Sequence, residues 1–135
     1  MKLNNIKKQA GLTLIEVTLV IAVLLGLISV LFIGVSAYKE GSNRAKCILN
    51  ITNVQKAVRS FQNMYEKEVG NPLIHDTSLV GEGKMIETEP ECPSKGGADN
   101  YTWGTTVPEI GTVYLVCSYQ TSEETAHTPA DTEGW

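Results

Sequence analysis

The sequence predicts an α+β protein: a long N-terminal α-helix with a small C-terminal antiparallel β-sheet domain packed on its second half. Three observations lead to this prediction. Residues 17–38 contain no charged side chain, apolar residues at helical spacing continue beyond them to Tyr65, and residues 112–119 alternate in polarity like a strand. With 135 residues the chain has the length of one domain, since domains run to about 100–200 residues.

The first half of the predicted helix is long enough to span a membrane. Residues 17–38 are 22 consecutive uncharged positions, mostly Leu, Ile and Val. As a helix they extend over about 33 Å, whereas the hydrocarbon core of a bilayer is about 30 Å thick. Lys2, Lys7 and Lys8 precede this segment and predict a cytoplasmic N-terminus, with everything after Tyr38 outside. The three cysteines would then meet an oxidising compartment.

The second half of the helix is predicted to be amphipathic. Six apolar residues recur at intervals of four and three and therefore share one helical face. They are Cys47, Ile51, Val54, Val58, Phe61 and Tyr65. Gly70 and Pro72 provide a stop signal, so we expect one helix from about Leu12 to about Val69, with Gly41 as a candidate bend. We divide it into a transmembrane and assembly part, 12–37, and an amphipathic part, 38–69.

A small distal domain is expected over residues 70–120. Two strand candidates, 100–103 and 112–119, are joined through 108–111 and predict an antiparallel hairpin laid on the helix stripe. So small a domain cannot build a large core, and a covalent staple is expected. Residues 121–135 are rich in Thr, Glu, Ala and Asp and predict a mobile acidic tail.

Charge and motifs exclude several classes of function. Residues 71–135 hold eleven acids and two bases, which argues against nucleic acid as the main partner, because phosphate binding requires clustered Lys and Arg. The sequence contains no Walker loop, HExxH, GxSxG or CxxC motif. We therefore predict that the protein is not an enzyme and has neither a cofactor nor a metal site.

The start of the chain resembles a known processing signal. Residues 7–26, KKQAGLTLIEVTLVIAVLLG, join a basic leader, Gly11, Glu16 and an uncharged helix. This string resembles the leader junction of type IV prepilins and of the related pseudopilins and competence pilins. The resemblance implies that residues 1–11 are a leader, that a prepilin peptidase cuts after Gly11, and that Leu12 becomes the N-methylated first residue. Two departures are Leu12, where Phe is commoner, and the lack of a Pro in the apolar segment.

The chemistry of Glu16 supports an assembly role without the resemblance. After cleavage, Leu12 would carry a cationic amine one helical turn from the Glu16 carboxylate, in a low-dielectric layer where unpaired ions are costly. Pairing Glu16 with the Leu12 amine of a neighbouring subunit would relieve both charges and fix the axial register. The alternative is that Glu16 reaches the lipid headgroups near the membrane edge.

Three cysteines allow three single bridges, and the sequence alone does not choose among them. We favour a disulfide between Cys92 and Cys117, because both lie in the strand-rich part. The segment from Cys92 also resembles a Cys-Pro, Gly-Gly, Tyr, Cys signature of some small pilin-like proteins. Cys47 is then expected to be a buried thiol on the helix stripe.

Other polar residues are interpreted as surface groups. His75 and His127 lie in polar segments and are predicted to be exposed. Four acids lie close together in the distal part, and their spacing does not match an EF-hand, so an acidic surface is favoured over a calcium site. These acids are Glu87, Glu89, Glu91 and Asp99.

The resemblance implies a structural subunit of a type IV pilus or pilus-like filament. Such a protein enters the bacterial inner membrane as a single-pass precursor and ends in an extracellular or periplasmic filament. Its partners are copies of itself, the prepilin peptidase, the assembly machinery and the membrane. Three alternatives stay open: a pseudopilin of type II secretion or a competence pilin, an exported binding protein cleaved after Ala37, and a small exported thiol enzyme that uses Cys47.

Overall fold

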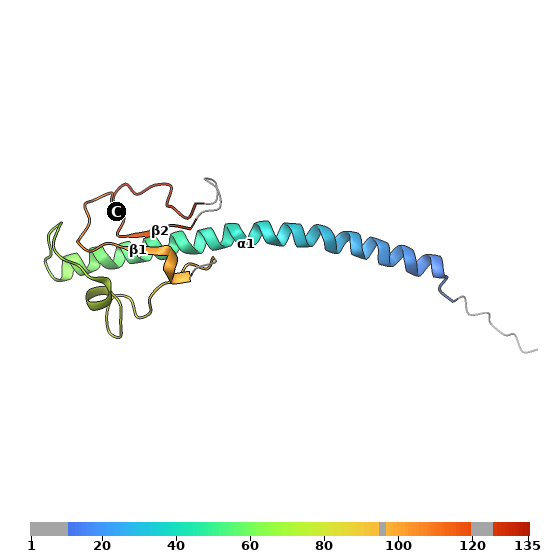
Figure 1. The fold of residues 1–135 in the computed structure, drawn as a ribbon, viewed down its shortest axis with the longest axis horizontal. Coiled ribbons are helices and arrows are strands. Elements are labelled where there is room, and N and C mark those ends of the chain that lie inside the picture. The colour runs from blue at the N-terminus through green and yellow to red at the C-terminus, as the bar shows by residue number, and fades with distance from the viewer. Residues whose placement is uncertain (1–10, 95–96, 120–125) are drawn as a thin grey trace, which may run out of the picture. The chain divides into compact units, whose positions relative to one another are not determined.

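The computed structural model describes residues 11–94, 97–119 and 126–135 (Figure 1). It has one long helix, two short helical turns and a two-stranded sheet, which confirms the predicted α+β class. The elements are helix α1 (Leu14–Met64), a π-helical turn (His75–Leu79), a 3-10 turn (Gly97–Asn100), strand β1 (Tyr101–Trp103) and strand β2 (Leu115–Cys117). The chain divides into two units, residues 1–37 and residues 38–135.

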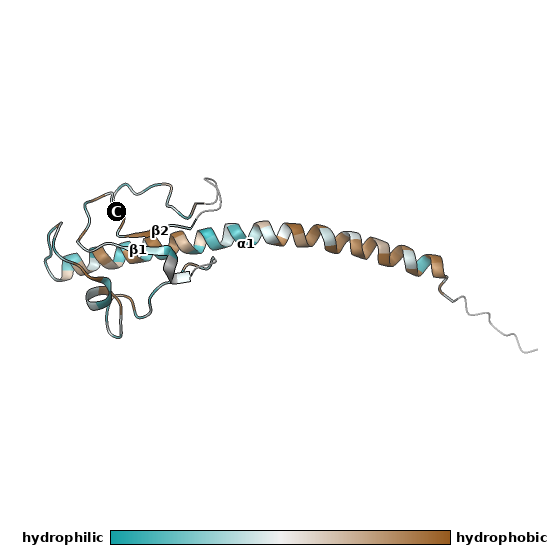
Figure 2. Ribbon diagram, in the orientation of Figure 1, coloured by the Kyte–Doolittle hydropathy of each residue, from teal (hydrophilic) through white to brown (hydrophobic). Residues whose placement is uncertain are grey.

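The N-terminal unit presents an apolar helical surface on all sides. Every residue from Gly11 to Ala37 is exposed, and this part of α1 is coloured apolar almost throughout in Figure 2. The helix is long and apolar enough to cross a membrane, and none of its most apolar stretch is buried. Burying an exposed Leu or Ile side chain contributes about 1.5–3 kcal/mol, so this surface favours contact with lipid or with other apolar helices.

The second unit is built on the predicted stripe of α1. Five of the six stripe residues are buried: Cys47, Ile51, Val54, Val58 and Phe61. The sixth, Tyr65, is 57% exposed because α1 ends at Met64 and not near Val69. Gly41 lies inside α1, and the helix continues through this position without interruption.

A residue with a left-handed backbone conformation follows the end of helix α1. Glu66 has φ 49°, and the backbone N–H of Lys67 donates to the carbonyl of Gln62 at 2.9 Å. A positive φ followed by this hydrogen bond is the Schellman arrangement, which usually places Gly where Glu66 stands. Helix α1 therefore ends before Gly70, the residue at which the sequence predicted its end.

The hairpin is antiparallel, as predicted, but its strands are shorter. Tyr101 pairs with Cys117 and Trp103 with Leu115, and the buried residues of β2 alternate with the exposed Val116. The prediction of a strand from residue 112 was too long. The backbone of residues 112–114 instead contacts α1: the buried Gln55 side chain donates to the Thr112 carbonyl at 3.0 Å and accepts from the Tyr114 N–H at 2.9 Å.

Loops supply most of the remaining core. The stripe of α1 forms one hydrophobic cluster with residues from the loops and the hairpin, chiefly Leu73, Leu79, Tyr101, Val107, Tyr114 and Leu115. The Tyr114 hydroxyl donates to the Leu73 carbonyl at 2.7 Å, which ties the hairpin to the loop after α1. Burial raises the pKa of Tyr114 to about 12, so this hydroxyl is a donor at neutral pH.

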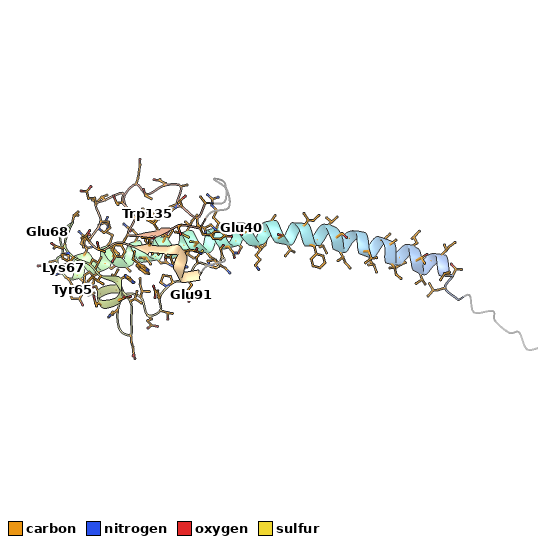
Figure 3. The ribbon with its side chains drawn as sticks, in the orientation of Figure 1. Glu40, Tyr65, Lys67, Glu68, Glu91 and Trp135 are labelled. Carbon is orange, nitrogen blue, oxygen red and sulfur yellow. The ribbon has the colours of Figure 1, made fainter. Side chains whose placement is uncertain are left out.

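The C-terminal segment 126–135 packs on the domain. The Arg59 guanidinium donates to the carbonyls of Pro108, Glu109 and Trp135 at 2.7–2.9 Å, and Trp135 (labelled in Figure 3) packs against the core. These contacts place residues 126–135, the described part of the predicted tail, against the domain, and the mobility of the tail stays a prediction. Residues 120–125 lie outside the described part of the chain.

Candidate functional site

The start of α1 carries the first candidate site. Thr13 and Glu16 bond reciprocally: the Thr13 N–H and hydroxyl donate to Glu16 Oε2 at 2.9 and 3.2 Å, and the Glu16 N–H donates to the Thr13 hydroxyl at 3.3 Å. This arrangement is a capping box, which satisfies N–H groups that have no partner within the helix. The Thr-x-x-Glu spacing of residues 13–16 is the sequence signal for this cap.

The other predicted processing residues flank this cap. Gly11 and Leu12 precede the helix and are exposed, so the predicted cleavage site is accessible in this structure. The predicted pair between Glu16 and the Leu12 amine of a neighbouring subunit involves two chains and stays a prediction. Glu16 already accepts hydrogen bonds through Oε2, and a carboxylate has capacity for further donors.

The second candidate site is a buried cluster of sulfur and nitrogen atoms. Cys47, Cys92, Cys117 and His127 each direct one donor atom to a common point, and these four atoms all lie within 4.8 Å of one another. Cys92 Sγ lies 3.9 Å from Cys117 Sγ and 3.4 Å from His127 Nδ1, and Cys117 Sγ lies 3.9 Å from the same nitrogen. All four residues are at most 4% exposed.

Four separate segments bring the cluster together. Cys47 comes from the stripe of α1 and Cys117 from the buried side of β2. Cys92 follows Glu91, whose carbonyl accepts a hydrogen bond from the Asn50 side chain at 3.0 Å. This contact holds the segment before Cys92 against α1.

His127 is fixed to the same helix. The Arg44 side chain donates to the Ala126 carbonyl at 2.9 Å, which holds the residue next to His127 against α1. His127 Nε2 lies 3.7 Å from Glu40 Oε1; both atoms are buried, and neither makes a hydrogen bond to the described residues. The ring therefore directs Nδ1 to the three sulfurs and Nε2 to a carboxylate.

Burial shifts the pKa of several of these groups. It raises the pKa of the Cys47 and Cys117 thiols and of the Tyr101 hydroxyl above their ordinary values, and it lowers the pKa of His127. Neutral, inaccessible thiols are poor nucleophiles. The burial of Cys47 therefore gives no support to the thiol-enzyme alternative.

The prediction that His127 lies on the surface is wrong, because the residue is fully buried. Cys47 is buried on the helix stripe, as predicted. Cys92 and Cys117 are neighbours, yet their sulfurs are not bonded: 3.9 Å separates them, whereas a disulfide requires about 2.05 Å.

The remaining candidates lie outside this cluster. Glu87, Glu89 and Glu91 are exposed, as expected of an acidic solvated surface. His75 is partly buried, where its ring stacks on Trp103 at 4.3 Å, and it takes no part in the cluster. Neither feature gathers donor atoms around one point.

Comparison with models of protein families, with curated proteins and with solved structures finds no match for this chain. What the chain has is a long apolar N-terminal helix that can span a membrane, followed by a small C-terminal domain.

Proposed function

We propose that this chain is a structural subunit of a pilus-like filament of the type IV pilin class. It is inserted as a single-pass precursor, cut between Gly11 and Leu12, N-methylated at Leu12, and assembled through the N-terminal part of α1. The observation that carries this proposal is an all-round apolar helical surface with a single charged residue, Glu16, in its first turn.

The apolar surface supports association in two environments. Lipid covers it in the precursor, and copies of the same helix can replace lipid after processing, since both are equally apolar. Because apolar contact is non-directional, packing alone does not select an axial offset. A charged pair between Glu16 of one copy and the Leu12 amine of the next supplies that selection.

The capping box is compatible with this role. It explains how Glu16 is held at the first turn of α1 before assembly, because Thr13 donates twice to one carboxylate oxygen. The chain thus keeps an anion at a defined position where it costs little. The partners implied are copies of the chain, a prepilin peptidase, the assembly machinery and the inner membrane; catalysis forms no part of the proposed role.

A second candidate is an exported protein released after Ala37. One observation favours it: the second unit begins at Tyr38, the residue that would follow a signal-peptidase cut. Against it stands the length of the apolar segment, since signal cores usually have about 7–15 apolar residues. A pseudopilin or competence pilin would share the N-terminal features of a pilus subunit.

N-terminal sequencing and intact-mass measurement of the mature protein test these candidates. A chain that starts at methylated Leu12 supports the filament subunit, whereas one that starts at Tyr38 refutes it. Gly11→Leu should block processing. Gly26→Leu is the matched control, because a Cβ at either glycine meets no atom within 4 Å. Equal processing of both variants would also count against the proposal.

A further inference from the structure

We propose that Cys47, Cys92, Cys117 and His127 bind one zinc ion, which joins α1, the hairpin and the C-terminal segment. Three thiolates and one imidazole form a Cys₃His donor set, a common composition of structural zinc sites. The inference is independent of the proposed filament role, since all four residues belong to the second unit.

The spacing of three of the four donor atoms fits a tetrahedron. With Zn–S near 2.3 Å and Zn–N near 2.0–2.1 Å, a tetrahedral site requires about 3.8 Å between sulfurs and about 3.5 Å between sulfur and nitrogen. The structure has 3.9 Å between Cys92 and Cys117, and 3.4 and 3.9 Å from these sulfurs to His127 Nδ1. Cys47 Sγ completes the set within 4.8 Å of the other three atoms.

A disulfide explains less of this geometry. A bridge between Cys92 and Cys117 would use two of the four converging groups and would leave the Cys47 thiol and the His127 nitrogen facing it. It would also require the sulfurs to approach by nearly half their separation of 3.9 Å. A shared metal ion gives each of the four groups a partner, and for Cys92, Cys117 and His127 it does so at close to the present spacing.

Two neighbouring side chains are placed to hold the ligands of such an ion. Tyr101 donates a hydrogen bond to Cys47 Sγ at 3.3 Å, a contact that stabilises a thiolate. Glu40 (labelled in Figure 3) lies opposite, where its carboxylate faces the far nitrogen of His127 at 3.7 Å. Zinc-binding imidazoles generally donate their second N–H to such a carboxylate, which fixes the ring and the tautomer.

The site is structural rather than catalytic. Four protein ligands fill a tetrahedral zinc ion, and the burial of all four leaves no position for water or substrate. The ligands are far apart in sequence, at positions 47, 92, 117 and 127, so the ion closes long loops in a domain with two three-residue strands. Its binding energy thereby contributes directly to folding.

The test uses the full-length chain, purified in detergent without added chelator. We expect about one zinc ion per chain by elemental analysis and four S and N neighbours by X-ray absorption. Replacement by Co²⁺ should give the intense visible bands of a tetrahedral thiolate site. A preparation that holds no zinc and has lost two thiol hydrogens by mass would overturn the proposal in favour of the disulfide.

Treatment of the wild-type chain with a chelator or with a reductant distinguishes a bound zinc ion from a disulfide. A zinc-held domain should show a lower thermal midpoint after chelation and an unchanged midpoint with a non-chelating phosphine reductant alone. A disulfide-held domain should show the reverse, and that result would refute the site. This comparison requires no substitution and so does not depend on a variant that folds.

Substitutions then assign the ligands. His127→Cys should retain one ion with an altered Co²⁺ spectrum, whereas His127→Ala should lose the ion; His75→Ala is the matched control and should retain it. Glu40→Gln should weaken zinc affinity about 10–100-fold, the usual cost of a lost outer-shell partner. The matched acid is the exposed Glu66, whose change to Gln should have no effect. Full zinc content and unchanged affinity in both His127→Ala and Glu40→Gln would place the ion elsewhere.

Discussion

The observed role of Glu16 as a helix cap and its proposed role in assembly can be separated by one substitution. Glu16→Gln removes the negative charge but keeps an oxygen that accepts hydrogen bonds from the Thr13 N–H and hydroxyl, now 2.9 and 3.2 Å from Oε2. Gln is an accepted residue at this position of a capping box. The helix should therefore start at the same residue, and membrane insertion and processing should be normal.

The expected loss lies in assembly. Removing one partner of a buried ion pair costs about 3–5 kcal/mol, because the other charge is left unpaired. At about 1.4 kcal/mol per factor of ten, each subunit contact weakens roughly 10²–10⁴-fold. Thr13→Ala is the matched control, since it keeps the charge and costs only the cap, about 0.5–2 kcal/mol at the end of one helix.

Filament yield, measured by shearing and sedimentation and normalised to processed subunit in the membrane, distinguishes the two roles. We expect Glu16→Gln to abolish filaments and Thr13→Ala to retain most of them. Wild-type yield from Glu16→Gln would refute the charge-pair argument. Equal loss in both variants would indicate that the cap, and not the charge, is what assembly requires.

Three further predictions concern the stability of the second unit, measured as thermal unfolding of the full-length chain in detergent. Gly104→Ala should destabilise by about 1–3 kcal/mol, because its Cβ would lie 2.7 Å from the buried Tyr114 ring; an unchanged midpoint would contradict that contact. Gln55→Ala should cost about 2–4 kcal/mol, since it leaves the Thr112 carbonyl and the Tyr114 N–H without their present partner. Glu66→Gly should stabilise by about 0.5–1 kcal/mol by removing a side chain from a left-handed position, and Glu66→Ala, which keeps a Cβ there, should not.

The sequence predicts those parts of the fold that depend on local periodicity. The α1 stripe and the alternation of Leu115, Val116 and Cys117 could be recognised because burial repeats with the period of the element. The end of α1 could not, because Glu66 adopts a conformation that favours Gly, and the earlier stop follows from the backbone geometry. Likewise, the shortened β2 follows from the Gln55 side chain, which replaces a strand partner.

The sequence predicts the cysteines of the buried cluster but not its histidine. The two cysteines of the hairpin region were expected to meet, and Cys47 was expected to be buried, but nothing local links them to His127. A histidine in a Thr- and Ala-rich segment has no periodic neighbours to indicate burial. Its position depends on Arg44, which holds the preceding carbonyl, and on Glu40, which faces the ring. Such contacts across more than 80 positions leave no mark in a local window of sequence.

The two units should fail independently when perturbed. The exposed, uncharged surface of residues 17–37 requires lipid or apolar partners, whatever the state of the distal domain. The distal domain has little regular sheet, and its segments are held to α1 by side-chain bonds to backbone groups and by the cysteine–histidine cluster. Loss of the cluster should therefore leave insertion and cleavage intact while the distal domain unfolds. Loss of the Glu16 charge should leave the domain folded while assembly stops. A variant of either site that produced both defects would show that the two units depend on each other for stability.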